Sequence, residues 1–244
     1  MVKLKQGNCL ELMKDIQDQS VDCVVVDPPY RLNKSTGSMT SSSKSEKWQG
    51  LIKAGDKRAG IMNDTLFSEW LSLVYNTMKS QSHIYIFVND KNLADLMNAM
   101  NKAGFRIHNV LVWKKNNATP NRWYMKNAEF IVFGRKGKAK PINNLGSKSI
   151  IEINNIRNKI HPTQKPIELL QMLITNSTDR GDVVFDCFMG SGSTGIACLN
   201  TNRQFIGMEL DQEYFEIAKK RIYRHQVQLD RDWETIKHYI TSVR

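Results

Sequence analysis

The turn Asp27-Pro28-Pro29-Tyr30 places a carboxylate and an aromatic ring directly after an apolar run, residues 21–26. The run is rich in β-branched residues and is typical of a short strand buried on both faces of a parallel sheet. Two consecutive prolines cannot continue a strand ladder, so the chain must leave the sheet here. We therefore expect Asp27 and Tyr30 at the carboxyl edge of a strand, where open α/β sheets bind ligands. An ordinary proline turn is the competing interpretation.

A second candidate site is a glycine-rich turn. Gly190, Gly192 and Gly195 have the spacing Gly-x-Gly-x-x-Gly, after an apolar run that ends at Asp186 and before a predicted helix. Such glycines let the backbone approach a ligand closely, and the helix N-terminus offers its N–H groups. The next predicted strand ends in Glu209, at the distance at which an acid binds ribose hydroxyls in nucleoside-binding folds. Together these features predict a nucleoside cofactor.

The carboxylate of Asp186 favours one nucleoside cofactor over another. A nicotinamide dinucleotide normally needs a second mononucleotide half downstream, and only about one βα unit follows Glu209. A carboxylate before the loop would also repel a pyrophosphate and suits a cationic ligand. S-adenosylmethionine combines an adenosine with a cationic sulfonium and an amino acid, and it has no phosphate. The residues therefore favour S-adenosylmethionine.

Composition and charge limit the class of protein. The 244 residues, 41% of them hydrophobic, suffice for one α/β core and predict a single domain over residues 1–244. The formal net charge of +11 indicates a polyanionic partner, with nucleic acid first and an anionic membrane second. The cysteines and histidines lack metal-ligand spacing, so we expect no metal and reduced thiols. With no signal-like or membrane-spanning apolar run, we expect a cytoplasmic protein without a membrane partner.

The rest of the chain must position the two sites. Strands are predicted at 2–4, 21–27, 83–88, 105–113, 130–133, 150–153, 182–186 and 205–209, and helices at 9–16, 66–79, 91–103, 167–176, 193–199 and 213–225. This alternation predicts a mostly parallel sheet with helices on both faces. Basic, polar segments at about 31–60 and 135–160 interrupt it, as does a basic aromatic loop at 114–124. We expect these segments to contact the polyanion.

With both sites in view, the chain resembles the S-adenosylmethionine-dependent DNA amino-methyltransferases. Four segments carry the resemblance: the Asp27–Tyr30 turn, the loop at 186–194, the run His161-Pro162-Thr163-Gln164-Lys165-Pro166, and the aromatic strand at 127–133. Because the catalytic motif precedes the cofactor motif, the chain looks like the β group of the family. The resemblance implies a Rossmann-like methyltransferase fold with permuted motif order.

The resemblance also implies a role for individual residues. The catalytic residues would be Asp27, Pro28, Pro29 and Tyr30. The cofactor-binding residues would be Asn8, Cys9, Asp27, His161, Thr163, Lys165, Asp186, Phe188, Gly190, Ser191, Gly192, Ser193, Thr194 and Glu209. The target base and DNA would be contacted by Tyr30, Trp48, Arg122, Phe130 and Phe133, although core packing explains the two phenylalanines equally well. The chain departs from the family in Cys187, where proline is usual, and in Asn8, where aspartate is usual.

The implied activity is transfer of a methyl group from S-adenosylmethionine to the exocyclic N6 of an adenine flipped out of duplex DNA. The amine is a poor nucleophile because its lone pair is delocalised, so Asp27 and the carbonyl of Pro28 would accept its hydrogen bonds and orient it. Alternatives are methylation of cytosine N4, an RNA amino-methyltransferase and an inactive DNA-binding module. A homodimer and a cognate restriction endonuclease stay open as further partners.

Overall fold

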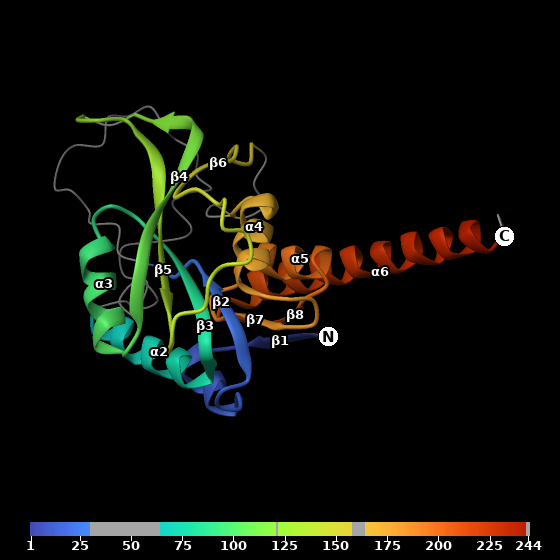
Figure 1. Ribbon diagram of the computed structural model, residues 1–244, viewed down its shortest axis with the longest axis horizontal. Helices are drawn as coiled ribbons and strands as arrows, with labels where there is room; N and C mark the ends of the chain where they lie inside the picture. The colour runs from blue at the N-terminus through green and yellow to red at the C-terminus, as the bar shows by residue number, and fades with distance from the viewer. Residues whose placement is uncertain (30–63, 121, 158–163, 243–244) are drawn as a thin grey trace.

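The computed structural model describes residues 1–29, 64–120, 122–157 and 164–242 (Figure 1). These residues form an eight-stranded sheet in the order β1-β8-β7-β2-β3-β5-β4-β6, in which β5 runs antiparallel to its two neighbours and the other pairs are parallel. The strands are β1 (Val2–Gln6), β2 (Val21–Val26), β3 (Met78–Val88), β4 (Arg106–Thr119), β5 (Lys126–Arg135), β6 (Ile150–Glu152), β7 (Val183–Asp186) and β8 (Gln204–Glu209). The expected mostly parallel α/β sheet is confirmed.

Helices cover both faces of the sheet, as the alternation of strands and helices predicts. They are α1 (Cys9–Leu12), the short 3-10 helix Met13–Asp15, α2 (Asp64–Thr77), α3 (Leu93–Lys102), α4 (Ile167–Ser177), α5 (Ser193–Asn200) and α6 (Gln212–Ser242). In Figure 1, α2 and α3 lie on one side of the sheet, α4 and α5 lie on the other, and α6 runs outward from the body. Within the described residues, no helix is both long and apolar enough to cross a membrane.

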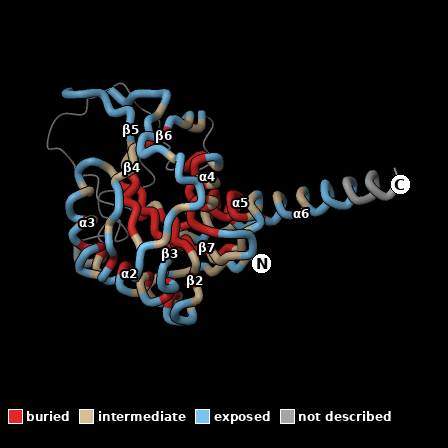
Figure 2. Tube along the Cα trace, viewed as in Figure 1, coloured by how far each residue is buried: buried red, intermediate tan, exposed pale blue. Residues whose placement is uncertain are grey.

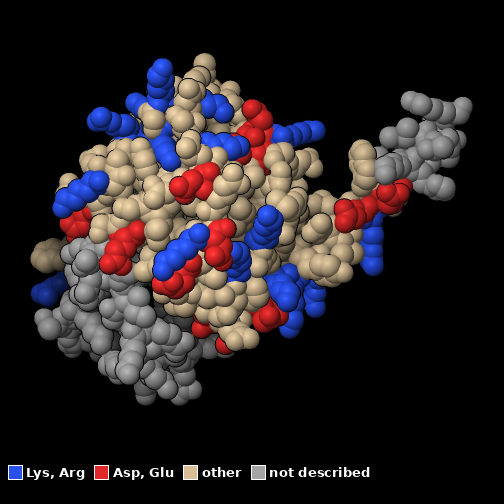
Figure 3. All heavy atoms as spheres, turned by 90° about the horizontal axis from the view of Figure 1, so that it is seen from below, with Lys and Arg blue, Asp and Glu red and all other residues tan. Residues whose placement is uncertain are grey.

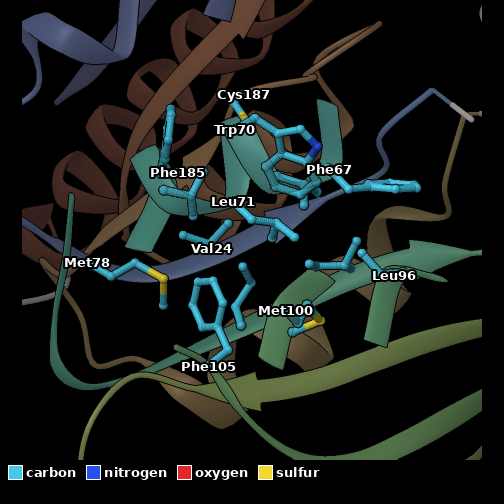
Figure 4. Close-up of a cluster of buried hydrophobic side chains, with 14 of the residues drawn as sticks. Val24, Phe67, Trp70, Leu71, Met78, Leu96, Met100, Phe105, Phe185 and Cys187 are labelled. Atoms are coloured by element: carbon cyan, nitrogen blue, oxygen red, sulfur yellow. The ribbon is translucent and has the colours of Figure 1, made fainter. Parts of the chain in front are cut away.

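Alternating side chains of β2 supply two hydrophobic cores. Val24 and Val26 belong to a cluster with residues of α2 and α3, whereas Cys23 and Val25 belong to a cluster with residues of α4, α5 and α6. In Figure 2 the buried positions concentrate along the central strands, and Figure 4 shows Trp70, Leu71 and Met100 around Val24. A strand that is buried on both faces in this way is rigid, and it ends directly before Asp27.

Several expected boundaries are wrong at the ends of elements. β4 extends to Thr119, into the segment that we expected to be a loop, because the ribbon pairs with β5 beyond Lys114, up to Thr119 opposite Lys126. β3 already begins at Met78, where it pairs with Val21. The charged C-terminal segment, for which the sequence predicts no element after residue 225, is helical to Ser242. At the ends of β4 and α6 polar residues adopt regular structure where hydrophobic periodicity is absent, whereas β3 begins at the buried side chain of Met78.

Much of the polar segment at 135–160 packs on the domain instead of forming a separate unit. The side-chain amide of Asn143 donates to the backbone carbonyls of Thr175 and Thr178 at the end of α4 (2.9 and 3.0 Å). Ile151 of β6 is 5% exposed and pairs with Trp113 of β4. The segment therefore builds the edge of the sheet, and DNA contacts from it stay a prediction.

Close packing of α5 and α6 against β8 requires the third glycine of the loop. A Cβ atom at Gly195 would lie 2.6 Å from Cδ1 of Ile222 and 2.9 Å from the ring of Phe205. Because this overpacks a full core, we expect Gly195→Ala to lower the free energy of unfolding by about 1–3 kcal/mol in a urea titration. Gly146→Ala, at an exposed position, is the matched control and should stay within about 0.5 kcal/mol of wild type. Equal stability of the two variants would contradict the packing argument.

Candidate active site

The carboxyl ends of three neighbouring strands bring three acidic side chains to one edge of the sheet. β2 pairs in parallel with β7, and β7 pairs in parallel with β8. Asp27 follows the last residue of β2, while Asp186 and Glu209 are the last residues of β7 and β8. Parallel neighbours end at the same edge, so residues far apart in the sequence meet there.

Asp186 is buried at the start of the glycine-rich loop. Its carboxylate accepts a hydrogen bond from the hydroxyl of Thr194 (2.6 Å) and one from the backbone N–H of Phe188 (3.0 Å). Burial raises the pKa of Asp186 to about 7, and these two hydrogen bonds only partly oppose that rise. Both donors are neutral, so the buried carboxylate is well suited to receive a cationic group.

Glu209 holds the glycine-rich loop from the neighbouring strand. One carboxylate oxygen accepts the backbone N–H of Gly190 and the other accepts the backbone N–H of Asp211, both at 2.9 Å. Burial raises the pKa of Glu209, and these hydrogen bonds work in the opposite direction. Gly192 follows with a φ of +79°, a conformation that favours glycine, and forms the N-cap of α5. The loop is therefore shaped before any ligand binds.

Arg221 of α6 holds the glycine-rich loop, a contact that the sequence did not reveal. From α6 its guanidinium donates to the carbonyl (2.9 Å) and hydroxyl (3.2 Å) of Ser191 and to the hydroxyl of Ser193 (3.1 Å). Nothing in the spacing of α6 indicates such a contact, because the partner lies on another element. The serines that we expected to bind cofactor thus also connect the loop to α6.

Asn8 and Cys9 lie beside this loop at the end of β1. The Asn8 side chain accepts the backbone N–H of Leu10 (3.0 Å) and caps α1, a role that asparagine and aspartate fill equally well. The thiol of Cys9 is hydrogen-bonded to that of Cys187, and this bond lowers the pKa of Cys9. The two departures from the family therefore lie at one place, where each has a local structural partner.

Asp27 lies next to Lys165, which we expected to bind cofactor. The Lys165 ammonium is 2.5 Å from Oδ2 of Asp27 and 2.9 Å from Oε1 of Glu129. Lys115 lies 2.7 Å from the other oxygen of Glu129. Neither Glu129 nor Lys115 was among the expected site residues. The sequence did contain a signal for Glu129, which directly precedes the apolar strand residues 130–133. An acid that is buried at such a position needs a cation as its partner.

The two phenylalanines of β5 have different surroundings. Phe130 pairs with Val88 at the carboxyl end of β3 and is half-buried. Phe133 pairs with Tyr85, further from that edge, and its ring stacks on the Tyr85 ring with centroids 4.8 Å apart. Phe133 is 8% exposed within the core, so the structure favours core packing for it and leaves Phe130 as the candidate for the target-base pocket.

The hairpin between β4 and β5 carries the most exposed aromatic residues of the described chain. Trp123 is 80% exposed, Tyr124 is 95% exposed, and the Arg122 guanidinium lies 5.9 Å from the Trp123 ring centroid. In the face shown in Figure 3, basic and acidic side chains lie next to one another over much of the surface. The net positive charge is therefore not concentrated in one block on that face.

Some expected site residues lie outside the described residues. These are Tyr30, Trp48, His161 and Thr163, together with the segment 31–60. In the described part of the chain, no group of three or more His, Cys, Asp or Glu side chains could hold a metal ion.

Comparisons with known proteins agree with this geometry. Residues 21–220 match the family N6_N4_Mtase, described as DNA methylase. The chain is 31% identical to Type II methyltransferase M2.MboI of Moraxella bovis over 89% of this chain and 86% of that protein. It is 28% identical to Type II methyltransferase M2.DpnII of Streptococcus pneumoniae over 90% and 88%. The M1.HpyAVI-SAM complex superposes with a TM-score of 0.67 at 27% identity, covering 91% of this chain and all of that one. The Asp27 turn and the glycine-rich loop lie at one sheet edge, and these matches establish that the chain belongs to the DNA methylase family.

Proposed function

We propose that this DNA methylase transfers a methyl group from S-adenosylmethionine to the exocyclic N6 of an adenine that is flipped out of duplex DNA. The observation that carries the proposal is the arrangement of Asp27 beside Asp186 and Glu209 at one edge of the sheet. In this proposal Asp27 faces the DNA base, while Asp186 and Glu209 hold a loop suited to a nucleoside. This arrangement supports the binding of a methyl donor next to an acceptor amine.

The residues of the loop fit S-adenosylmethionine. When bound, this cofactor supplies an electrophilic methyl group on a sulfonium. Asp186, buried with neutral hydrogen-bond donors, would neutralise the cationic amino-acid part. Glu209 would accept hydrogen bonds from the ribose hydroxyls, and the backbone near Gly190 and Gly192 leaves room for the ligand to approach closely. Phe188 packs edge-on against Trp70 of α2, with ring centroids 5.2 Å apart, which holds the loop on the domain.

Asp27 would act by hydrogen bonding and orientation. Its carboxylate and the carbonyl of Pro28 accept hydrogen bonds from the exocyclic amine, so that the nitrogen lone pair points at the methyl group. In this scheme the amine nitrogen would bond to the methyl carbon as the carbon–sulfur bond breaks, the sulfur would leave as a neutral thioether, and the proton lost by the amine would leave by way of Asp27 or water. Prolines 28 and 29 fix the backbone, so these acceptors are in place before the base arrives.

Adenine is the base that we propose, with cytosine N4 as the second candidate. The family name N6_N4_Mtase includes methylation of both N6 and N4 amines. Both reactions need the same hydrogen-bond acceptors for the amine. The first residue of the turn favours adenine, because aspartate is the form that resembles the adenine enzymes whereas N4 enzymes more often carry serine. A cognate restriction endonuclease, a homodimer and a cytoplasmic location stay predictions of the sequence.

The first test identifies the product and the role of Asp27 together. Wild-type protein incubated with duplex DNA and S-adenosylmethionine should yield N6-methyladenine when the DNA is digested to nucleosides and analysed by mass spectrometry. Asp27→Ala should yield none while binding cofactor, because it removes the acceptor of the amine and leaves the loop intact. N4-methylcytosine as the product would replace adenine by the second candidate. Methylation by Asp27→Ala at near wild-type rate would exclude the assigned role.

The pKa of Asp186 predicts how cofactor affinity depends on pH. A bound cation stabilises the ionised carboxylate and so lowers a pKa that burial has raised to about 7. Below that value the carboxyl must release a proton on binding, so affinity should fall by up to about tenfold per pH unit from about pH 7 downward. Isothermal titration across this range measures the effect. Asp186→Asn should bind more weakly with most of the pH dependence lost, and a wild-type affinity independent of pH would contradict the assignment.

The β4–β5 hairpin is the described surface that we propose to contact DNA. Exposed aromatic rings next to a cationic side chain bind nucleic acid by stacking and by phosphate contact. We expect Trp123→Ala to weaken DNA binding roughly tenfold, in line with the stacking of one base. Tyr223→Ala, which removes a 67% exposed ring on α6, is the matched control and should bind as wild type does. Fluorescence anisotropy with labelled duplex measures both, and equal affinities for the two variants would remove the hairpin from the DNA-binding surface.

A further inference from the structure

Four side chains of alternating charge form a row that ends on the carboxylate of Asp27. Lys115 is 2.7 Å from Oε2 of Glu129, and Lys165 bridges Oε1 of Glu129 (2.9 Å) and Oδ2 of Asp27 (2.5 Å). The members come from β4, β5, the residues before α4 and the end of β2. Four separate segments of the chain therefore converge on one oxygen atom of the proposed catalytic residue.

The row is largely removed from solvent. The side chains of Lys165, Glu129, Asp27 and Lys115 are 8, 11, 17 and 21% exposed. The Lys165 ammonium also lies 4.9 Å from the centroid of the Phe87 ring. Two cations and two anions cancel one another, which is the condition under which charges tolerate such burial.

Both inner members of the row are held in their charged forms. Burial lowers the pKa of Lys165, but the carboxylates of Asp27 and Glu129 outweigh it, so the pKa lies above its ordinary value. Burial raises the pKa of Glu129, but Lys165 and Lys115 outweigh it, and this pKa lies below its ordinary value. Lys165 is therefore an ammonium and Glu129 a carboxylate at neutral pH.

We propose that Lys165 and Glu129 are positioning residues for the methyl-transfer reaction: Lys165 fixes the plane of the Asp27 carboxylate, and Glu129 holds Lys165 in place. Anchoring Oδ2 determines where the second oxygen points, and the target amine must donate to a precisely placed acceptor. Glu129 shares the ammonium, so Asp27 keeps more of its strength as a hydrogen-bond acceptor than it would beside an undivided cation. This inference rests on the proposed function of Asp27.

A purely stabilising role explains the row less well. Buried ion pairs contribute little net stability, because the cost of removing the charges from water offsets their attraction. An apolar edge would serve packing at least as well. The row also ends on Asp27, the side chain after β2 that the proposed reaction needs.

The kinetics of the Lys165→Met and Glu129→Gln variants, measured in the same reaction with duplex DNA as the wild-type protein, test the inference. A misplaced acceptor lowers kcat, so we expect a loss of about 100-fold for Lys165→Met and about tenfold for Glu129→Gln. The dissociation constant for S-adenosylmethionine should stay within about threefold, because neither residue contacts cofactor in this scheme. Lys165→Arg should recover part of the lost kcat, because it restores a cation that binds carboxylates.

The pH–rate profile distinguishes positioning from structural support. The described charged groups near Asp27 are Lys165 beside it, Glu129 behind Lys165, and Asp186 at the end of β7. Without its cation, the Asp27 carboxylate ionises less readily, so the acid limb should move to higher pH in Lys165→Met. In Glu129→Gln the ammonium no longer shares its charge with the Glu129 carboxylate, so it stabilises ionised Asp27 more strongly and the limb should move to lower pH. Loss of fold would not produce shifts of opposite sign.

Lys79→Met is the matched control. It breaks an ion pair of similar length (2.7 Å) to Asp22, near the opposite end of β2, and should leave kcat and the pH profile unchanged. Methylation by wild type in the same assay establishes the underlying function independently of the variants. Any of three results would overturn the inference. The first is a wild-type kcat in Lys165→Met, and the second is a loss of S-adenosylmethionine affinity in the variants while kcat at saturating cofactor is kept. The third is identical pH–rate profiles for Lys165→Met and Glu129→Gln.

Discussion

Parallel pairing of β2 with β7 is the constraint on which the site depends. The register aligns Val24 with Phe185, so the residues that follow each strand leave the sheet at the same edge. Asp27 and Asp186 are thereby neighbours although most of the chain lies between them. An antiparallel pairing would send the two carboxylates to opposite ends of the sheet. The permuted order of the motifs along the chain is therefore immaterial to the site, since only strand order and direction determine what meets at the edge.

Gathering acids at one edge creates an electrostatic problem, and the structure solves it differently for each of them. Glu209 is compensated by backbone N–H groups of the loop and of residue 211. Asp27 is compensated by the ammonium of Lys165. In the described residues Asp186 accepts hydrogen bonds from two neutral donors, the Thr194 hydroxyl and the Phe188 N–H, and burial raises its pKa to about 7. The carboxylate with the least compensation is the one best suited to a cationic cofactor, which matches a sulfonium amino acid rather than a pyrophosphate.

Close packing behind the edge keeps these groups in place. Gly195 and Gly207 admit the ring of Phe205 and the side chains around it at distances that a Cβ atom would forbid. Arg221 connects α6 to the two serines of the loop. The loop, its following helix and β8 thus pack directly against one another, so a substitution on α6 or β8 can reach the proposed cofactor site through contact.

The sequence by itself determined the fold class, the family and the two motifs, because these depend on local patterns. An apolar run that ends in prolines, and glycines between a strand and a helix, are read within one short segment, and their occurrence together in this order is what indicated the family. What the tertiary structure alone decided are the pairings between segments. Lys165 contacts Asp27, Glu129 joins the site, Arg221 holds the loop, and Phe133 belongs to the core. Each of these follows from strand register and from contacts across the sheet, which no spacing along a single segment encodes. Element ends such as those of β4 and α6 were missed for the same reason, since their polar residues are ordered by hydrogen bonding and not by a buried face.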